Sequence, residues 1–145
     1  MRISRRAFAL LLLPAGAAWA DLESVKAEQN LYKRARKAME NANAALDAAR
    51  EAYLAGDLEQ TNARLEEVED SVRLAYDSLQ ATGRKPRKIA KHYKRAEIGA
   101  RQLIRRLNGF RDTMSYLDRE KIDEVIEHVE ELQDMLLDAV LGGGR

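Results

Sequence analysis

Residues 89–117 read IAKHYKRAEIGARQLIRRLNGFRDTMSYL, and this stretch decides the fold. Its apolar residues recur at alternating steps of four and three, a spacing that places them along one face of an α-helix. These positions are Ile89, Tyr93, Ala96, Ala100, Leu103, Leu107, Phe110, Met114 and Leu117. The pattern predicts one long helix over 86–117 that buries a single apolar stripe against neighbouring helices.

Three further stretches carry a stripe of the same kind. They run through Val25, Tyr32, Ala35, Met39, Ala42, Leu46, Ala49 and Tyr53, then Thr61, Leu65, Val68, Val72, Ala75 and Leu79, and last Ile122, Val125, Ile126, Val129, Leu132, Leu136, Ala139 and Val140. The stripes predict helices near 22–55, 57–80 and 118–141. Packed together, four such helices can shield all four stripes from water.

Two of the junctions between these helices are very short. Asp57 and Asp118 stand at the 55–57 and 117–118 junctions, where each is expected to cap the helix that follows. Gln60 occupies the capping-box position after the first of them. If the chain stayed helical at both junctions, the result would be one long two-helix hairpin instead of a bundle.

The middle junction is the clearest loop in the sequence. Residues 80–86 read QATGRKP, a cluster of turn-forming and polar residues. Gly83 suits the end of one helix, and Pro86 suits the first turn of the next. The segment therefore divides the chain into two halves.

The two halves repeat one another at a distance of 61 residues. The motif YKRA occurs at 32 and again at 93, and 12 of the 49 positions in 31–79 are identical in 92–140 without a gap. The repeat predicts an all-α fold, an antiparallel four-helix bundle made of two tandem helical hairpins, about 22–80 and about 86–141. The first copy is rich in alanine where the second carries larger side chains, so small and large residues can interdigitate.

Composition supports one helical domain and excludes several classes of site. The chain has 145 residues, of which 34% are charged and 6% aromatic, and it has no cysteine. The absence of cysteine excludes disulfides, thiolate metal sites and thiol catalysis. About 125 residues remain after the N-terminal segment described next, which is enough for one core. The glycine-rich tail at 142–145 is expected to be disordered.

The first 20 residues have the pattern of a cleavable export signal. Residues 1–20 read MRISRRAFALLLLPAGAAWA, with a basic start, a short apolar run and small residues before the cleavage site after Ala20. The apolar run is much shorter than the roughly 18 residues that span a bilayer. The sequence therefore predicts a periplasmic or secreted protein without a transmembrane segment. Residues 4–8, SRRAF, also resemble the core of the twin-arginine signal, so that route and the general secretory route both remain open.

Charges are segregated between the predicted helices. Ten lysines and arginines and one acid lie between Arg84 and Arg106, whereas nine acids and two bases lie between Asp118 and Asp138. One interpretation is that the basic helix pairs with acidic neighbours in the bundle. The other is a face for an anionic partner at the loop, formed by Arg84, Lys85, Arg87, Lys88 and Lys91. Without the signal the chain has 22 basic and 24 acidic residues, so no nucleic-acid partner is expected.

No recognisable catalytic or metal site is present. A di-iron bundle needs Glu three residues before each histidine, but Ile89 precedes His92 and Val125 precedes His128 at that distance. Glu124 stands four residues before His128, where an ion on the helix face is an alternative to a solvated histidine. We expect no catalytic residue, no metal, no cofactor and no enzymatic activity.

Two short segments resemble known helical proteins. Residues 52–58, AYLAGDL, resemble the turn of tetratricopeptide units, which are peptide-binding helical hairpins. The repeat here is 61 residues against about 34 in that family, so the resemblance implies shared turn chemistry. Residues 21–23 are faintly similar to the start of an exported b-type cytochrome, a four-helix bundle that binds haem through Met and His. Lys26 stands near the place of its axial Met, which argues against haem here.

Two functions fit these observations. The first is a binding or interaction module of the cell envelope, an adaptor or chaperone-like protein that presents charged faces to a protein or another anionic component. The alternative is a carrier that holds an apolar ligand or a haem-like cofactor between its helices, where Ala35, Ala42 and Ala49 face Leu103 and Phe110. Alanine-rich stripes also pair between chains, so a homodimer stays open.

Overall fold

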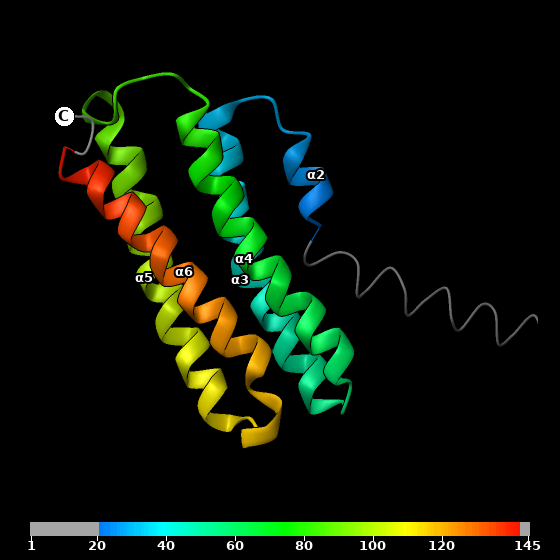
Figure 1. The fold of residues 1–145 in the computed structure, drawn as a ribbon. Coiled ribbons are helices and arrows are strands. Elements are labelled where there is room, and N and C mark those ends of the chain that lie inside the picture. Colours follow the sequence, from blue (N-terminus) through cyan, green and yellow to red (C-terminus); the bar gives the residue numbers. More distant parts are fainter. Residues whose placement is uncertain (1–20, 143–145) are drawn as a thin grey trace, which may run out of the picture.

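A computed structural model describes residues 21–142 as an all-helical protein, with no strand in that part of the chain (Figure 1). Its five α-helices are α2 (Leu22–Lys26), α3 (Leu31–Leu54), α4 (Leu58–Gln80), α5 (Ala90–Thr113) and α6 (Glu120–Val140). Two 3₁₀ turns, η1 (Pro86–Ile89) and η2 (Tyr116–Asp118), precede α5 and α6. The expected export signal and residues 143–145 of the tail lie outside the described residues.

The four long helices form two hairpins that lie face to face. α3 packs along α4, and α5 packs along α6, with opposite directions inside each pair. Between the pairs, α3 lies beside α5 and α4 lies beside α6, each with its neighbour in the same direction (Figure 1). The link at 81–85 therefore joins α4 to α5 across the diagonal of the assembly. The first helices of the two hairpins are thus neighbours, and so are the second helices.

The core forms where the predicted stripes meet. Each long helix contributes a leucine that is fully buried, for example Leu46, Leu65, Leu103 and Leu136. Burying one such side chain contributes roughly 1.5–3 kcal/mol relative to exposure in water. Some positions of the predicted stripes, such as Tyr32 and Val140, are half-buried, and Leu117 is 87% exposed. The helix ends before Leu117, and the turn carries its side chain into solvent.

The predicted first helix, 22–55, is wrong in one respect, because it is two helices. α2 ends at Lys26, and α3 begins at Leu31 with Asn30 as its N-cap. The Asn30 side chain accepts a hydrogen bond from the Lys33 amide at 3.0 Å, and the Asn30 amide donates to the Glu28 carboxylate at 3.1 Å. Asparagine satisfies free amides at a helix start better than it sustains a helix interior. The chain therefore breaks ahead of Asn30.

The junction between α3 and α4 follows the prediction. Asp57 caps α4 by accepting a hydrogen bond from the Gln60 amide at 2.9 Å. Gly56 has a φ of 79°, a left-handed conformation that costs glycine little. At the next junction Gly83 has a φ of 68°, and Pro86 opens η1, as expected for both residues.

The junction between α5 and α6 also turns, but Asp118 does not cap α6. That helix begins two residues later at Glu120, and no side chain caps its first turn. Asp118 instead accepts a hydrogen bond from the Tyr53 hydroxyl at 2.9 Å, and the same hydroxyl accepts one from the Ser115 amide at 2.8 Å. The predicted cap was wrong because a side chain from the other hairpin binds the carboxylate. Tyr53 thereby ties the two turns together.

Candidate functional site

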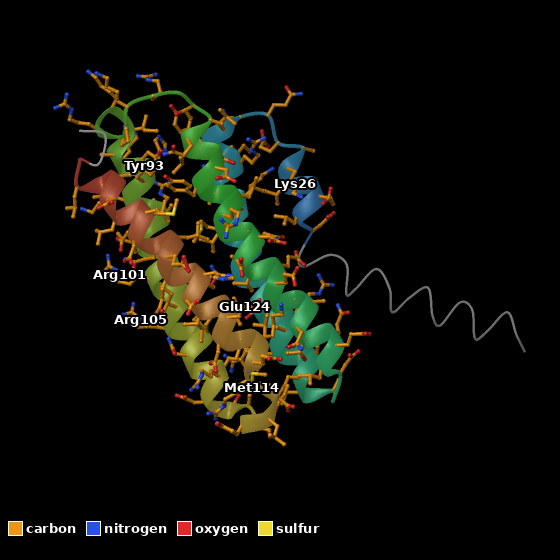
Figure 2. All side chains as sticks on the ribbon, viewed as in Figure 1. Lys26, Tyr93, Arg101, Arg105, Met114 and Glu124 are labelled. Carbon is orange, nitrogen blue, oxygen red and sulfur yellow. The ribbon has the colours of Figure 1, made fainter. Side chains whose placement is uncertain are left out.

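Five exposed cations gather at the link between the hairpins, and we call this group the basic face. It consists of Arg84 and Lys85 in the link, Arg87 and Lys88 in η1, and Lys91 in the first turn of α5. Within residues 21–142, no carboxylate oxygen lies within 4.0 Å of any of these five side chains. Figure 2 shows nitrogen-tipped side chains projecting from the link at one end of the molecule.

Three other cations of α5 are paired along the flanks of the assembly. The pairs are Arg101 with Glu97, Arg106 with Asp47, and Arg111 with Asp123. The last two pairs connect α5 to α3 and α6, so they also match the charge of one helix to that of another. Both interpretations of the charge segregation thus have a counterpart in the structure. Arg101, Arg106 and Arg111 have carboxylate partners, and the five neighbouring cations of the basic face have none among the described residues.

Glu97 is a buried charge with a complete set of partners. It is 3% exposed, and its carboxylate accepts hydrogen bonds from Arg101 at 2.7 Å and from Gln133 of α6 at 2.7 Å. The hydrogen bond from Arg101 lowers the pKa of Glu97 against the opposing effect of burial. A carboxylate compensated in this way acts as a structural connection between α5 and α6. It is not a poised acid or base.

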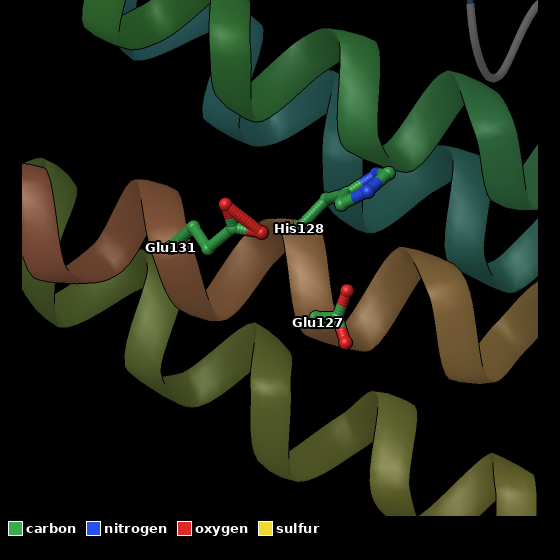
Figure 3. Close-up of side chains that lie close together, drawn as sticks. All are labelled: Glu127, His128 and Glu131. Carbon is green, nitrogen blue, oxygen red and sulfur yellow. The ribbon is translucent and has the colours of Figure 1, made fainter.

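The one candidate ion site in residues 21–142 lies on α6. Glu127, His128 and Glu131 have ligand atoms within 4.8 Å of one another. Figure 3 shows these three side chains on α6. The His128 Nδ1 atom lies 2.9 Å from the Glu69 carboxylate of α4, and this hydrogen bond raises the pKa of His128. A metal ion would have to compete with that contact. Glu124, the i−4 neighbour noted in the sequence, is bound to Lys121 at 3.0 Å instead.

A surface groove of about 310 Å³ lies between α3 and α5. Its lining comes mainly from Tyr32, Ala35, Arg36, Met39, Glu40, Asn43, Leu79, His92, Arg95, Ala96, Ile98, Gly99 and Gln102. The Tyr32 and His92 rings meet at its end near the link, with centroids 4.3 Å apart. Burial and the neighbouring cations Lys91 and Arg95 lower the pKa of His92, which favours the neutral ring.

Sequence reasoning missed this groove and expected any ligand deeper in the assembly. Of the small residues named for that site, only Ala35 lines the groove, whereas Ala42 and Ala49 are fully buried in the core. In the sequence, Gly99 was the residue that could have indicated the groove. A glycine inside a long helix costs about 1 kcal/mol relative to alanine, which points to a close approach or an opening.

The end of the molecule opposite the basic face exposes apolar side chains. Leu54 is 87% exposed, Tyr116 is 81% exposed and Leu117 is 87% exposed. They lie at the two turns that the Tyr53 hydroxyl connects. We call these three residues the apolar end. Large apolar side chains in water are unfavourable, and when grouped they commonly mark contact surfaces.

Comparisons with known proteins give no relative for this chain. No family model and no curated protein matches the sequence, and no solved structure matches the fold. None of the helices in residues 21–142 has the length and apolar character that crossing a membrane requires. Functional inference therefore rests on the basic face, the groove and the apolar end.

Proposed function

We propose that this protein is an exported, non-enzymatic binding module that presents its basic face to an anionic component of the cell envelope. The signal pattern of residues 1–20 supports export. Both histidines are engaged with groups other than a nucleophile, His128 with Glu69 and His92 with Tyr32. Adaptor and chaperone-like roles fit a small helical protein with charged and apolar surfaces.

The module is proposed to be a four-helix bundle of two tandem hairpins that arose by duplication. The 61-residue repeat pairs α3 with α5 and α4 with α6. These same helices are spatial neighbours with the same direction, as in stacked helical repeats. Each hairpin then supplies the surface that buries the apolar stripes of the other.

The observation that carries the function is the lack of carboxylate partners at the basic face among the described residues. Five like charges within eight residues repel one another, and this repulsion disfavours the folded chain unless counter-charges are near. On α5 itself, by contrast, Arg101, Arg106 and Arg111 each have a carboxylate partner. Cations near an anionic surface contribute about 1 kcal/mol each to binding. The basic face is therefore suited to an anionic partner outside the chain.

Binding to anionic vesicles tests this proposal. The mature chain, residues 21–145, is titrated with phosphatidylglycerol-containing vesicles and with zwitterionic vesicles at low and high salt. We expect salt-sensitive binding to the anionic vesicles alone, about fivefold weaker for Arg87→Gln. Arg105→Gln is the matched control, since Arg105 is an exposed arginine of α5 outside the basic face. Equal losses in both variants, or equal binding to both vesicles, would contradict the proposal.

A second candidate function is a carrier of an apolar ligand, and the groove between α3 and α5 favours it. Its volume of about 310 Å³ lies at the lower end of the range of small-molecule pockets. A carrier purified under native conditions should retain an extractable apolar molecule, which native mass spectrometry detects as added mass. A chain of unmodified mass after purification from the producing cell would argue against this candidate.

A further inference from the structure

We propose that the groove between α3 and α5 binds a single-chain anionic amphiphile, a long-chain carboxylate, with its head group between Arg36 and Arg95. The hydrocarbon chain would then lie along Met39 and Gly99, away from the link. This inference rests on the second proposed function, the carrier, and adds the chemical class and the orientation of the ligand. It concerns residues distinct from the basic face.

The groove has room for one hydrocarbon chain and not for two. On α3 the lining extends from Tyr32 to Asn43, which is about 16 Å along the helix, and about 10 Å of this lies beyond Arg36 on the side of the hydrocarbon chain. On α5 it extends from His92 to Gln102. A volume of about 310 Å³ distributed over that length makes the groove narrow, and we also call it the channel below. A lipid with two acyl chains would leave one of them in water.

Gly99 lets the Met39 side chain lie close against α5 in the wall of the groove. A Cβ atom on this residue would lie 3.0 Å from the Met39 Cε atom. Any larger side chain would therefore displace Met39 or fill the space beside it. Methionine is flexible and polarizable, so Met39 can adapt its position to an alkyl chain. Ala35 and Ala96, which are small and buried, continue the apolar lining on each side.

The head-group end is defined by two arginines on opposite walls. Arg36 stands one helical turn after Tyr32, and Arg95 stands one turn after His92, so both follow the ring contact that closes the channel. Both side chains are exposed, and neither has a carboxylate oxygen within 4.0 Å among the described residues. The planar guanidinium group matches a carboxylate in a bidentate arrangement.

Glu40 fixes the orientation of the ligand. It lines the same channel one turn beyond Arg36, on the side away from the link. A carboxylate head placed there would be repelled by the Glu40 side chain, whereas a head between the arginines is attracted. Charge complementarity thus favours one of the two directions in which a chain can lie in the channel.

Nuclear magnetic resonance of the ¹⁵N-labelled mature chain tests the site. The probe is dodecanoate below its micelle concentration, and the readout is the backbone amide of Gly99 compared with that of Gly109. Gly109 lies on the same helix and is exposed, and a Cβ atom added to it would have open space within 4 Å. We expect a saturable shift at Gly99 and little change at Gly109. Shifts confined to the basic face would overturn the proposal.

Two glycine variants separate occupancy of the groove from general effects. Gly99→Leu fills the channel and should reduce dodecanoate affinity by about tenfold or more, whereas Gly109→Leu should bind as the wild type does. Both substitutions replace glycine by a better helix former, so loss of the fold does not account for the difference. Circular dichroism checks that helicity is kept. Equal affinity of both variants would refute binding in the groove.

The head group is tested with charge variants and a neutral ligand. Arg36→Gln combined with Arg95→Gln should weaken dodecanoate about tenfold and leave dodecanol unchanged. If wild-type protein binds dodecanol as tightly as dodecanoate, the anionic head-group assignment fails while the carrier function stands. If neither ligand shifts Gly99, both the assignment and an alkyl-chain carrier function fail.

Discussion

Replacing Asn41 by alanine should lower the free energy of unfolding by about 3 kcal/mol, because this amide connects three parts of the molecule. Asn41 is 7% exposed at the contact between α3 and α4. Its Nδ2 group donates to the Ser71 hydroxyl and to the Glu67 carboxylate, each at 2.9 Å. Its Oδ1 atom accepts a hydrogen bond from the Asp21 amide at 2.8 Å.

The magnitude follows from those three bonds. A neutral hydrogen bond contributes about 1 kcal/mol net, and one to a charged acceptor about 1.5–3 kcal/mol. The bond to Ser71 is neutral, and the bond to Glu67 is charge-assisted. In the mature chain the Asp21 nitrogen is the N-terminal amino group, which can donate the same hydrogen bond to Oδ1. Solvent partly replaces the partner of Glu67, so about 3 kcal/mol is the expected sum. For a domain of this size, that loss lowers the melting temperature by about 12 °C.

The assay is urea denaturation of the mature chain, followed by circular dichroism. Asn41→Ala, Ser71→Ala and the double variant form a cycle in which we expect a coupling energy of about 1 kcal/mol. Asn108→Ala is the matched control, since Asn108 is exposed and its side chain donates to the Ile104 carbonyl of its own helix. If the loss of stability in the double variant equals the sum of the losses in the two single variants within about 0.5 kcal/mol, the reasoning is refuted.

Three further outcomes are expected. Leu103→Ala should destabilise the protein by about 2–5 kcal/mol in urea denaturation because Leu103 is fully buried, whereas Leu117→Ala should change stability by less than about 0.5 kcal/mol. Proton resonances of the two histidine rings should titrate on opposite sides of pH 6.5, His128 above it and His92 below it, and a reversed order would contradict the contacts described. Glu97 has a lowered pKa, so its ionised form contributes stability above pH 4.5 that is lost as pH falls through the lowered pKa. Thermal melts across that range should therefore fall more steeply for the wild type than for Glu97→Gln.

Local sequence patterns predicted the helices because the stripes and caps are local features. The spacing around Leu103 and the cap at Asp57 depend on residues within one or two turns, and both predictions are confirmed. The role of Asp118 depends on Tyr53, which lies 65 residues away in the chain. A short window contains no information about that partner. The break ahead of Asn30 was readable from its capping preference, but the stripe through Val25 and Tyr32 obscured it.

The basic face and the groove also differ in how far the sequence alone could predict them. The basic face is a run of nearly contiguous charges, and its five residues were all identified from the sequence. The groove exists only because α3 lies beside α5, and these two helices are separated in the sequence by α4 and the link at 81–85. The spacing of the apolar residues predicts which residues lie in each stripe, but it does not predict which helices pack beside one another. Gly99 alone hinted that two of them leave an opening.

The diagonal link also means that the packing does not depend on the order of the hairpins along the chain. α3 and α5 begin, and α4 and α6 end, at the same end of the assembly (Figure 1). A circular permutant could therefore place the α5–α6 hairpin first and rejoin the chain from the end of α6 to the segment ahead of α3. Every contact between the hairpins would be retained. Residues 81–85 act as a tether that sets the local concentration of one hairpin around the other, and changing its length should alter assembly kinetics more than the final structure.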